Sequence, residues 1–163
     1  MIVPMTVMMM IASVGIAVST STTGSVPNLN ASEAPIAATY TKYRKAVECW
    51  AGVNPGASAV NLSPATLKAT NDVNGKPCMH PSYVGAAGIG STVTPTVLYV
   101  YMTPATVMGM PSPVEKIRNY YAPSTVGGIV TSSGQLINGK GLTYSFAGVQ
   151  LPVGSVVYQT SRL

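Results

Sequence analysis

Residues 32–52 constrain the fold most, because their apolar residues recur at the spacing of an α-helix. The apolar stripe consists of Ile36, Tyr40, Tyr43, Val47 and Trp50. Ser32 can cap the helix start, where Glu33 favours the positive end of the helix dipole, and Gly52 can end it. We therefore expect a helix over residues 32–52 that buries this stripe as part of the core.

The residues after this helix alternate between turn signals and short β-rich runs. Short helices are expected over 63–69 and over 112–121, where Ser112 and Glu115 have the spacing of a capping box. The expected strands span residues 96–102, 128–131, 135–137, 141–146 and 155–160, with a hairpin turn at Asn138-Gly139. This order predicts an α+β fold in which a long N-terminal amphipathic helix packs on a mostly antiparallel β-sheet.

The glycine-rich run at residues 85–90 superficially resembles a phosphate-binding loop. A P-loop would continue with Lys and Ser or Thr, and neither follows here. We interpret this run as a flexible loop without a ligand.

The first 18 residues are almost wholly apolar and carry no charge. Their length lies between the ~20 residues of a transmembrane helix and the ~7–15 apolar residues of a secretory signal. Residues 17–19 have the small-x-small form of a cleavage site, whereas the absence of a preceding basic residue disfavours a signal. An anchor or an export signal would place the rest of the chain outside the cytoplasm, while a buried N-terminal helix is the third reading.

These observations divide the chain into three parts. Residues 1–18 are an apolar transmembrane anchor or signal segment, and residues 19–31 are a tether rich in Ser, Thr and Asn. Residues 32–163 are expected to form one α+β domain outside the cytoplasm.

Charged side chains are scarce, with 9 Lys and Arg and 4 Asp and Glu, or 8% of the chain against ~25% in average soluble proteins. Four carboxylates and one histidine are too few for most acid–base or metal mechanisms, so we expect neither enzymatic activity nor a cofactor. A weakly charged, hydroxyl-rich surface resists self-association poorly, which suits a protein of an assembly and leaves a homo-oligomer open. A soluble exported domain is the alternative.

Lys42, Arg44 and Lys45 form a basic cluster off the apolar stripe and are a candidate contact face. Nucleic-acid binding would combine basic residues with exposed aromatic rings, but the helical spacing places the neighbouring aromatic residues on the buried stripe. We therefore expect no nucleic-acid partner, and the candidate contact face would instead meet an anionic membrane surface or a partner protein.

Cys49 and Cys78 are the only cysteines. In an exported domain they most simply form a disulfide, which would contribute roughly 3–4 kcal/mol by the chain-entropy estimate. Buried free thiols are a second reading. A metal or nucleophilic site with His80 is a third, which lacks a fourth strong ligand or an orienting group.

Several short motifs occur in an order that points to a known family. The apolar start and tether are followed by ATYTKYRKAV at residues 38–47, Asn54-Pro55, LYVY at 98–101 and LPVGSVV at 151–157. In these motifs the chain resembles the small PilM-type accessory proteins of type IVB (thin) pilus systems. The resemblance spans nearly the whole chain, and the family has no catalytic or metal motif to carry over.

The resemblance implies a non-enzymatic accessory component of pilus biogenesis, anchored in the inner membrane with a periplasmic domain. Its partners would be other pilus-assembly proteins, and its N-terminal segment would contact the membrane. A minor pilin or pseudopilin is the first alternative, but the fifth residue is Met5 rather than the usual Glu, and residues 20–31 would break a continuous helix. An exported, adhesin-like binding module is the second alternative.

Overall fold

The structure is a computed structural model that describes residues 29–85, 87–122, 127–132, 134–146 and 148–162. The expected anchor or signal segment, residues 1–18, and residues 19–28 of the expected tether lie outside these residues. Within the described ranges, no helix combines the length and the hydropathy that crossing a bilayer requires.

The long helix predicted from the apolar stripe is present as α1 (Ala34–Val53) and follows a 3₁₀ turn, η1 (Ala31–Glu33). The backbone N–H of Asn30 donates a 2.8 Å hydrogen bond to the Glu33 carboxylate. Asn30 is thus the N-cap of η1, and Glu33 is the N-cap of α1, so Ser32, the expected cap of the long helix, lies within the 3₁₀ turn. The helix also continues past Gly52, and the backbone N–H of Asn54 donates to the Trp50 carbonyl at its end.

The described strands form one seven-stranded, wholly antiparallel sheet. In chain order they are β1 (Ala59–Val60), β2 (Ile89–Val93), β3 (Val97–Met102), β4 (Gly127–Ser132), β5 (Gln135–Asn138), β6 (Thr143–Ser145) and β7 (Val156–Ser161). Their order across the sheet is β1-β2-β3-β7-β4-β5-β6, so the last strand of the chain lies between β3 and β4. The predicted fold class, α+β with an N-terminal helix and an antiparallel sheet, is confirmed.

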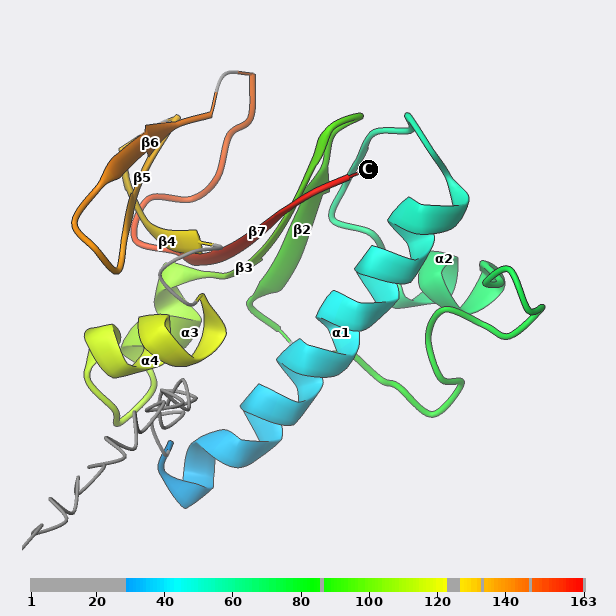
Figure 1. The fold of residues 1–163 in the computed structure, drawn as a ribbon. Coiled ribbons are helices and arrows are strands. Elements are labelled where there is room, and N and C mark those ends of the chain that lie inside the picture. The colour runs from blue at the N-terminus through cyan, green and yellow to red at the C-terminus, as the bar shows by residue number, and fades with distance from the viewer. Residues whose placement is uncertain (1–28, 86, 123–126, 133, 147, 163) are drawn as a thin grey trace, which may run out of the picture.

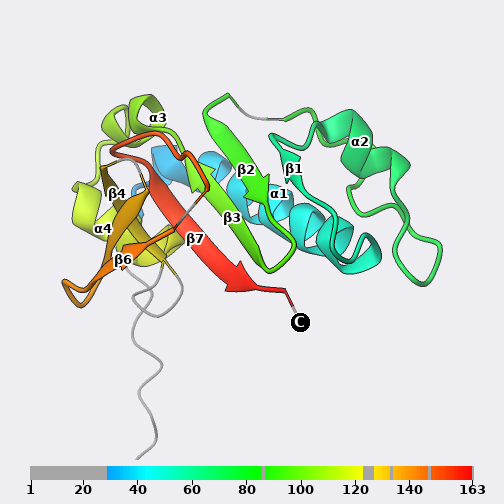
Figure 2. The same ribbon diagram turned by 90° about the horizontal axis from the view of Figure 1, so that it is seen from above.

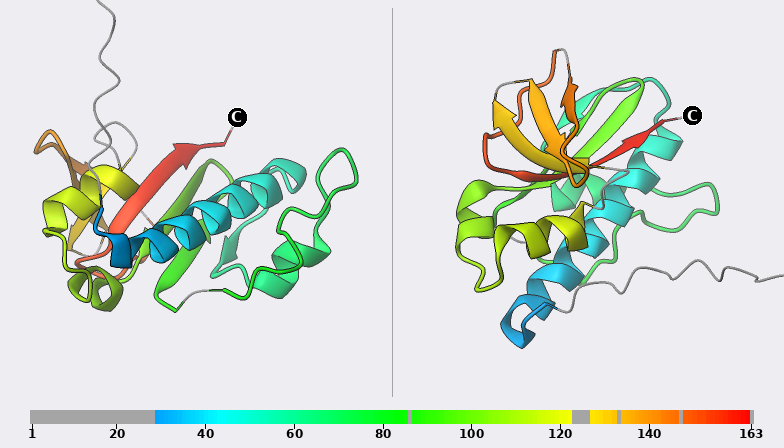
Figure 3. Two further views of the ribbon diagram at one scale, coloured as in Figure 1. Left: turned by 90° about the horizontal axis from the view of Figure 1, so that it is seen from below. Right: turned by 60° about the vertical axis from the view of Figure 1, so that its left-hand side comes forward.

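Helix α1 crosses one face of the sheet (Figure 1), and three short helices complete the fold. Helix α2 (Pro64–Ala69) lies near the C-terminal half of α1, whereas α3 (Pro104–Met108) and α4 (Val114–Tyr121) lie at the opposite end (Figure 2). Views from below and from the side show α4 beside the start of α1 (Figure 3). The helices therefore cover one face of the part of the sheet formed by β2, β3 and β7.

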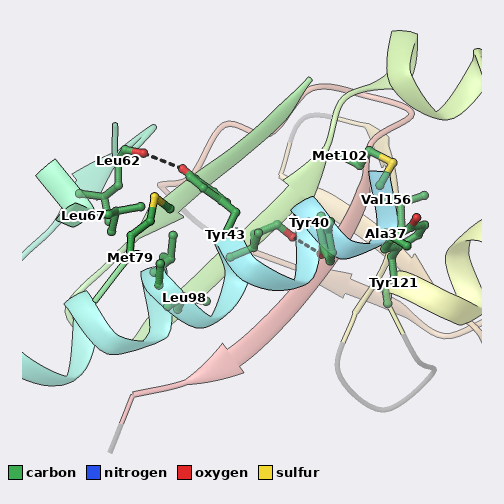
Figure 4. Packing of buried hydrophobic residues seen from close by; sticks show 14 of the residues in the cluster. Ala37, Tyr40, Tyr43, Leu62, Leu67, Met79, Leu98, Met102, Tyr121 and Val156 are labelled. Carbon is green, nitrogen blue, oxygen red and sulfur yellow. Dashed lines mark hydrogen bonds between the residues drawn. The ribbon is translucent and has the colours of Figure 1, made fainter. Parts of the chain in front are cut away.

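Alternation along β3 separates two hydrophobic cores. Leu98, Val100 and Met102 point toward α1, where they join Tyr40, Tyr121 and Val156 in the larger core (Figure 4). Tyr99 and Tyr101 point to the other face and pack in the smaller core with residues from β4 and β5 and from the chain that precedes β7. Strands β5 and β6 turn away from the plane of β2 and β3, so this part of the sheet covers the smaller core (Figure 1).

Two local expectations were wrong. Ser112 does not cap α4 against Glu115, because its Oγ and backbone N–H both donate to the Glu33 carboxylate, at 2.8 and 2.9 Å. Glu115 instead lies 3.4 Å from Arg118. The glycine-rich run is not wholly a loop, since its last two residues begin β2, where Gly90 pairs with Tyr101.

Candidate functional site

The structure separates the three residues of the predicted basic contact face: Lys42 and Lys45 stay together, and Arg44 does not join them. Lys42 and Lys45 are exposed on α1, at the i,i+3 spacing that places them on one side of the helix. Arg44 points elsewhere: its guanidinium lies 4.5 Å from the centre of the Tyr158 ring, and its Nε lies 3.7 Å from a carboxylate oxygen of Glu48. Arg44 thus joins α1 to β7, and two lysines remain as the candidate contact face.

Lys42 and Lys45 line a groove of about 700 Å³ between α1 and residues 78–85. Thr39 extends the helical wall, and Cys78, His80 and Tyr83 belong to the opposite wall. We call this the lysine groove. Its two walls come from segments more than thirty residues apart, which is why the sequence pattern did not show it.

The wall formed by residues 78–85 is fixed at several points. Cys78 forms a disulfide with Cys49 of α1, with the two Cα atoms 5.5 Å apart. The side chains of Met79 and Tyr83 are buried, and Met79 joins the large core beneath α1 (Figure 4). Between these anchors His80 is exposed and its Nδ1 lies 2.7 Å from Ser82 Oγ. The groove is therefore a formed feature of the fold.

The apolar stripe of α1 has a structural role in the site. Tyr40, Tyr43 and Val47 are buried, whereas Ile36 and Trp50 lie at the edge of the core and are partly buried. The stripe is wider than predicted, because small side chains on the same face are buried too; these are Ala37, Ala46 and Ala51.

The two buried tyrosines of the stripe end in hydrogen bonds to the protein. Tyr43 Oη donates to the Leu62 carbonyl at 2.9 Å and lies 2.9 Å from Ser91 Oγ, and Tyr40 Oη donates to the Val100 carbonyl at 3.1 Å (Figure 4). Burial raises the pKa of Tyr43 to about 12 and that of Tyr40 further. Both phenols are therefore neutral at physiological pH and hold α1 on the sheet.

A second hollow, of about 440 Å³, lies at the C-terminal end of α1 and is lined by Arg162 and Glu48 among others. The guanidinium of Arg162 donates to four backbone carbonyls at 2.6–2.8 Å, those of Ala51, Asn54, Ala57 and Thr94. Because its donors are used within the protein, Arg162 has a structural role. Sequence reasoning missed it, since a single arginine near the end of the chain gives no pattern.

No three His, Cys, Asp or Glu side chains come together as a metal-binding group among the residues that the structure describes. His80 lies two residues from Cys78, but the sulfur of Cys78 is bonded to that of Cys49. The feature best suited to a ligand is the lysine groove, which offers two ammonium groups on a preformed concave surface.

Comparison with known protein families identifies the family of the chain. A family model described as PilM matches residues 6–159, which include nearly all of the described chain. No curated protein and no solved structure matches the chain.

Proposed function

The chain belongs to the PilM family, which indicates a pilus-related accessory role, and from this premise we propose that it is a non-enzymatic component of type IVB pilus biogenesis. It is anchored in the inner membrane through residues 1–18, and its α+β domain lies in the periplasm and contacts other pilus-assembly proteins. The family match over residues 6–159 is the observation that carries this proposal.

Two further observations support the location and the role. The disulfide between Cys49 and Cys78 suits an oxidising compartment such as the periplasm. The scarcity of charge, 8% of residues, suits a protein whose surface meets other proteins of an assembly.

Deletion of the gene tests the pilus role. We expect thin pili, counted by electron microscopy, and the conjugation frequency that depends on them to fall sharply and to recover when the full-length gene is returned. Unchanged pilus numbers and unchanged conjugation in the deletion strain would contradict the proposal.

Cell fractionation with N-terminal sequencing tests the anchoring. We expect the native product in the inner-membrane fraction with the apolar segment retained at its N-terminus. A soluble periplasmic product that begins near Thr20 would show that residues 1–18 belong to a cleaved signal and are not an anchor. Recovery of the chain in sheared filaments would instead identify a filament subunit.

A further inference from the structure

We propose that the lysine groove binds an extended acidic segment of a partner protein. This inference rests on the proposed function, because it names the chemistry by which the domain recognises another component of the assembly. The groove is the one defined above, between α1 and residues 78–85, with Lys42 and Lys45 on its helical wall.

The charge of the groove is uncompensated. No Asp or Glu is among the residues that line it, whereas Lys42 and Lys45 are both exposed there. The four Asp and Glu side chains of the protein are engaged elsewhere: Glu33 with Ser112, Glu48 with Arg44, Asp72 with backbone N–H groups of its own turn, and Glu115 with Arg118. The groove is therefore complementary to a ligand that supplies carboxylates.

The spacing of the lysines fits an extended chain. Residues at i and i+3 on a helix have Cβ atoms about 5–6 Å apart. In an extended strand, alternate residues point to the same side and lie about 6.6 Å apart. Carboxylates two residues apart on an extended segment can therefore meet Lys42 and Lys45 together.

The shape of the groove favours a peptide over a lipid surface. A flat bilayer meets protruding side chains, whereas here the two lysines share a concavity of about 700 Å³ with the wall that the disulfide holds against α1. Val84, which is 94% exposed, lies in the same wall and offers an apolar contact. The expected ligand thus alternates carboxylates with an apolar residue, and a preformed groove spares the cost of ordering its wall.

Peptide binding tests this inference on the purified full-length chain. The probe is a fluorescent peptide with the sequence SEVELES, and its control is SQVQLQS, in which each Glu is replaced by Gln. We expect saturable binding of SEVELES by fluorescence anisotropy, at least tenfold weaker binding of the Gln peptide, and loss of affinity at high salt.

Charge-reversed variants test the position. Lys42→Glu and Lys45→Glu should each weaken SEVELES binding about tenfold or more. Lys140→Glu makes the same change of charge in the turn between β5 and β6, at the opposite edge of the sheet from β1, and should change the affinity less than twofold. Circular dichroism and the intact disulfide establish that each variant is folded.

Several outcomes would overturn the inference: no binding of SEVELES, equal weakening by Lys140→Glu, or binding only to phosphatidylglycerol vesicles with the same dependence on Lys42 and Lys45. The last outcome would assign the two lysines to a membrane surface.

A complementation experiment separates this inference from the proposed function. If deletion abolishes pili but the Lys42→Glu/Lys45→Glu gene restores them as well as the wild type, the pilus role stands and the acidic-segment inference fails. If deletion leaves pili unchanged, the pilus role fails whatever the peptide experiment shows.

Discussion

At the scale of single residues, Glu33 links the start of α1 to the chain before α4. Its carboxylate accepts hydrogen bonds from the backbone N–H of Asn30 and from the N–H and Oγ of Ser112, and the residue is 1% exposed. Burial alone would raise the pKa of Glu33, but these donors, with Lys116 nearby, lower it below its ordinary value of 4.5. The ionised form is therefore the one that the fold stabilises.

Glu33→Gln tests this link. The amide keeps one acceptor oxygen but turns an N–H₂ group toward donors, so we expect a loss of about 1–3 kcal/mol in the free energy of unfolding at pH 7, measured by urea denaturation. Because the folded pKa of Glu33 lies below its unfolded value, its stabilisation is fully present above pH 4.5 and is lost as pH falls through the folded pKa. The variant should therefore lose less stability than the wild type on acidification; an equal loss would assign the acid sensitivity to other groups.

Arg162 is a second single residue that we expect to contribute strongly to the stability of the fold, although it lies alone near the end of the chain. Its guanidinium reaches four backbone carbonyls at the end of α1 and in the turns beside it. Arg162→Ala removes these charge-assisted donors, so we expect a loss of about 2–4 kcal/mol in unfolding free energy. Arg162→Lys keeps the charge without the planar fork and should recover only part of it. Full recovery by Lys would show that charge alone matters.

At the scale of elements, strand β4 depends on glycine. Gly128 pairs with Asn138 of β5 and with Val157 of β7, and a Cβ atom added there would overlap the backbone carbonyl of Ile137. We expect Gly128→Ala to lower the unfolding free energy by about 2–4 kcal/mol, because two backbones must separate.

Gly52 is the matched control for this prediction. It lies near the end of α1, and a Cβ atom added there meets nothing within 4 Å. Gly52→Ala should therefore raise the unfolding free energy by about 0.5–1 kcal/mol through helix propensity and a less flexible unfolded chain. A similar loss of unfolding free energy in both variants would contradict the close approach of the β4 and β5 backbones at Gly128.

The elements differ in how far the sequence determines them. Helix α1 was predictable from an apolar periodicity of about 3.6, and strand β3 from a continuous run of β-branched, aliphatic and aromatic residues; both signals are local properties of the sequence. Strand β2 begins Ile-Gly-Ser and has no such signal, since Ser91 is buried only because Tyr43 and the Leu62 backbone provide hydrogen-bond partners. Short elements such as β1 and α3 depend on the tertiary structure around them in the same way.

At the scale of the whole molecule, the candidate site also has one part that follows from local sequence and another that depends on tertiary structure. The sequence indicated that Lys42 and Lys45 lie off the apolar stripe, because that follows from helical spacing. It could not separate Arg44 from them, since only the position of β7 brings Tyr158 beneath its guanidinium. The second wall of the groove could not be predicted without the tertiary structure. The predicted bond between Cys49 and Cys78 was the available signal, because Cys49 follows Lys45 by four residues on α1 and Cys78 begins that wall.

The disulfide between Cys49 and Cys78 affects both the stability of the domain and the shape of the lysine groove. It closes the loop between Cys49 and Cys78, 29 positions apart, which contains α2, and it ties the first residue of the groove wall to α1. We expect the double variant Cys49→Ala/Cys78→Ala to lose roughly 3–4 kcal/mol of unfolding free energy by urea denaturation. In the native protein, mass spectrometry should find no alkylated cysteine before reduction and two after it; alkylation of both without reductant would refute the bond.

The same variant also separates stability from binding. In this variant the wall of the groove is held by buried side chains such as Met79 and Tyr83 and by the hydrogen bond from the backbone N–H of residue 78 to the Thr70 carbonyl. We expect the wall to move more freely and the domain to bind the SEVELES peptide less tightly even where it stays folded. Lys42→Glu should weaken binding without the loss of stability, since Lys42 is exposed and forms no ion pair among the described residues. Unchanged peptide affinity in the folded double-cysteine variant would show that the disulfide stabilises the domain but does not shape the groove.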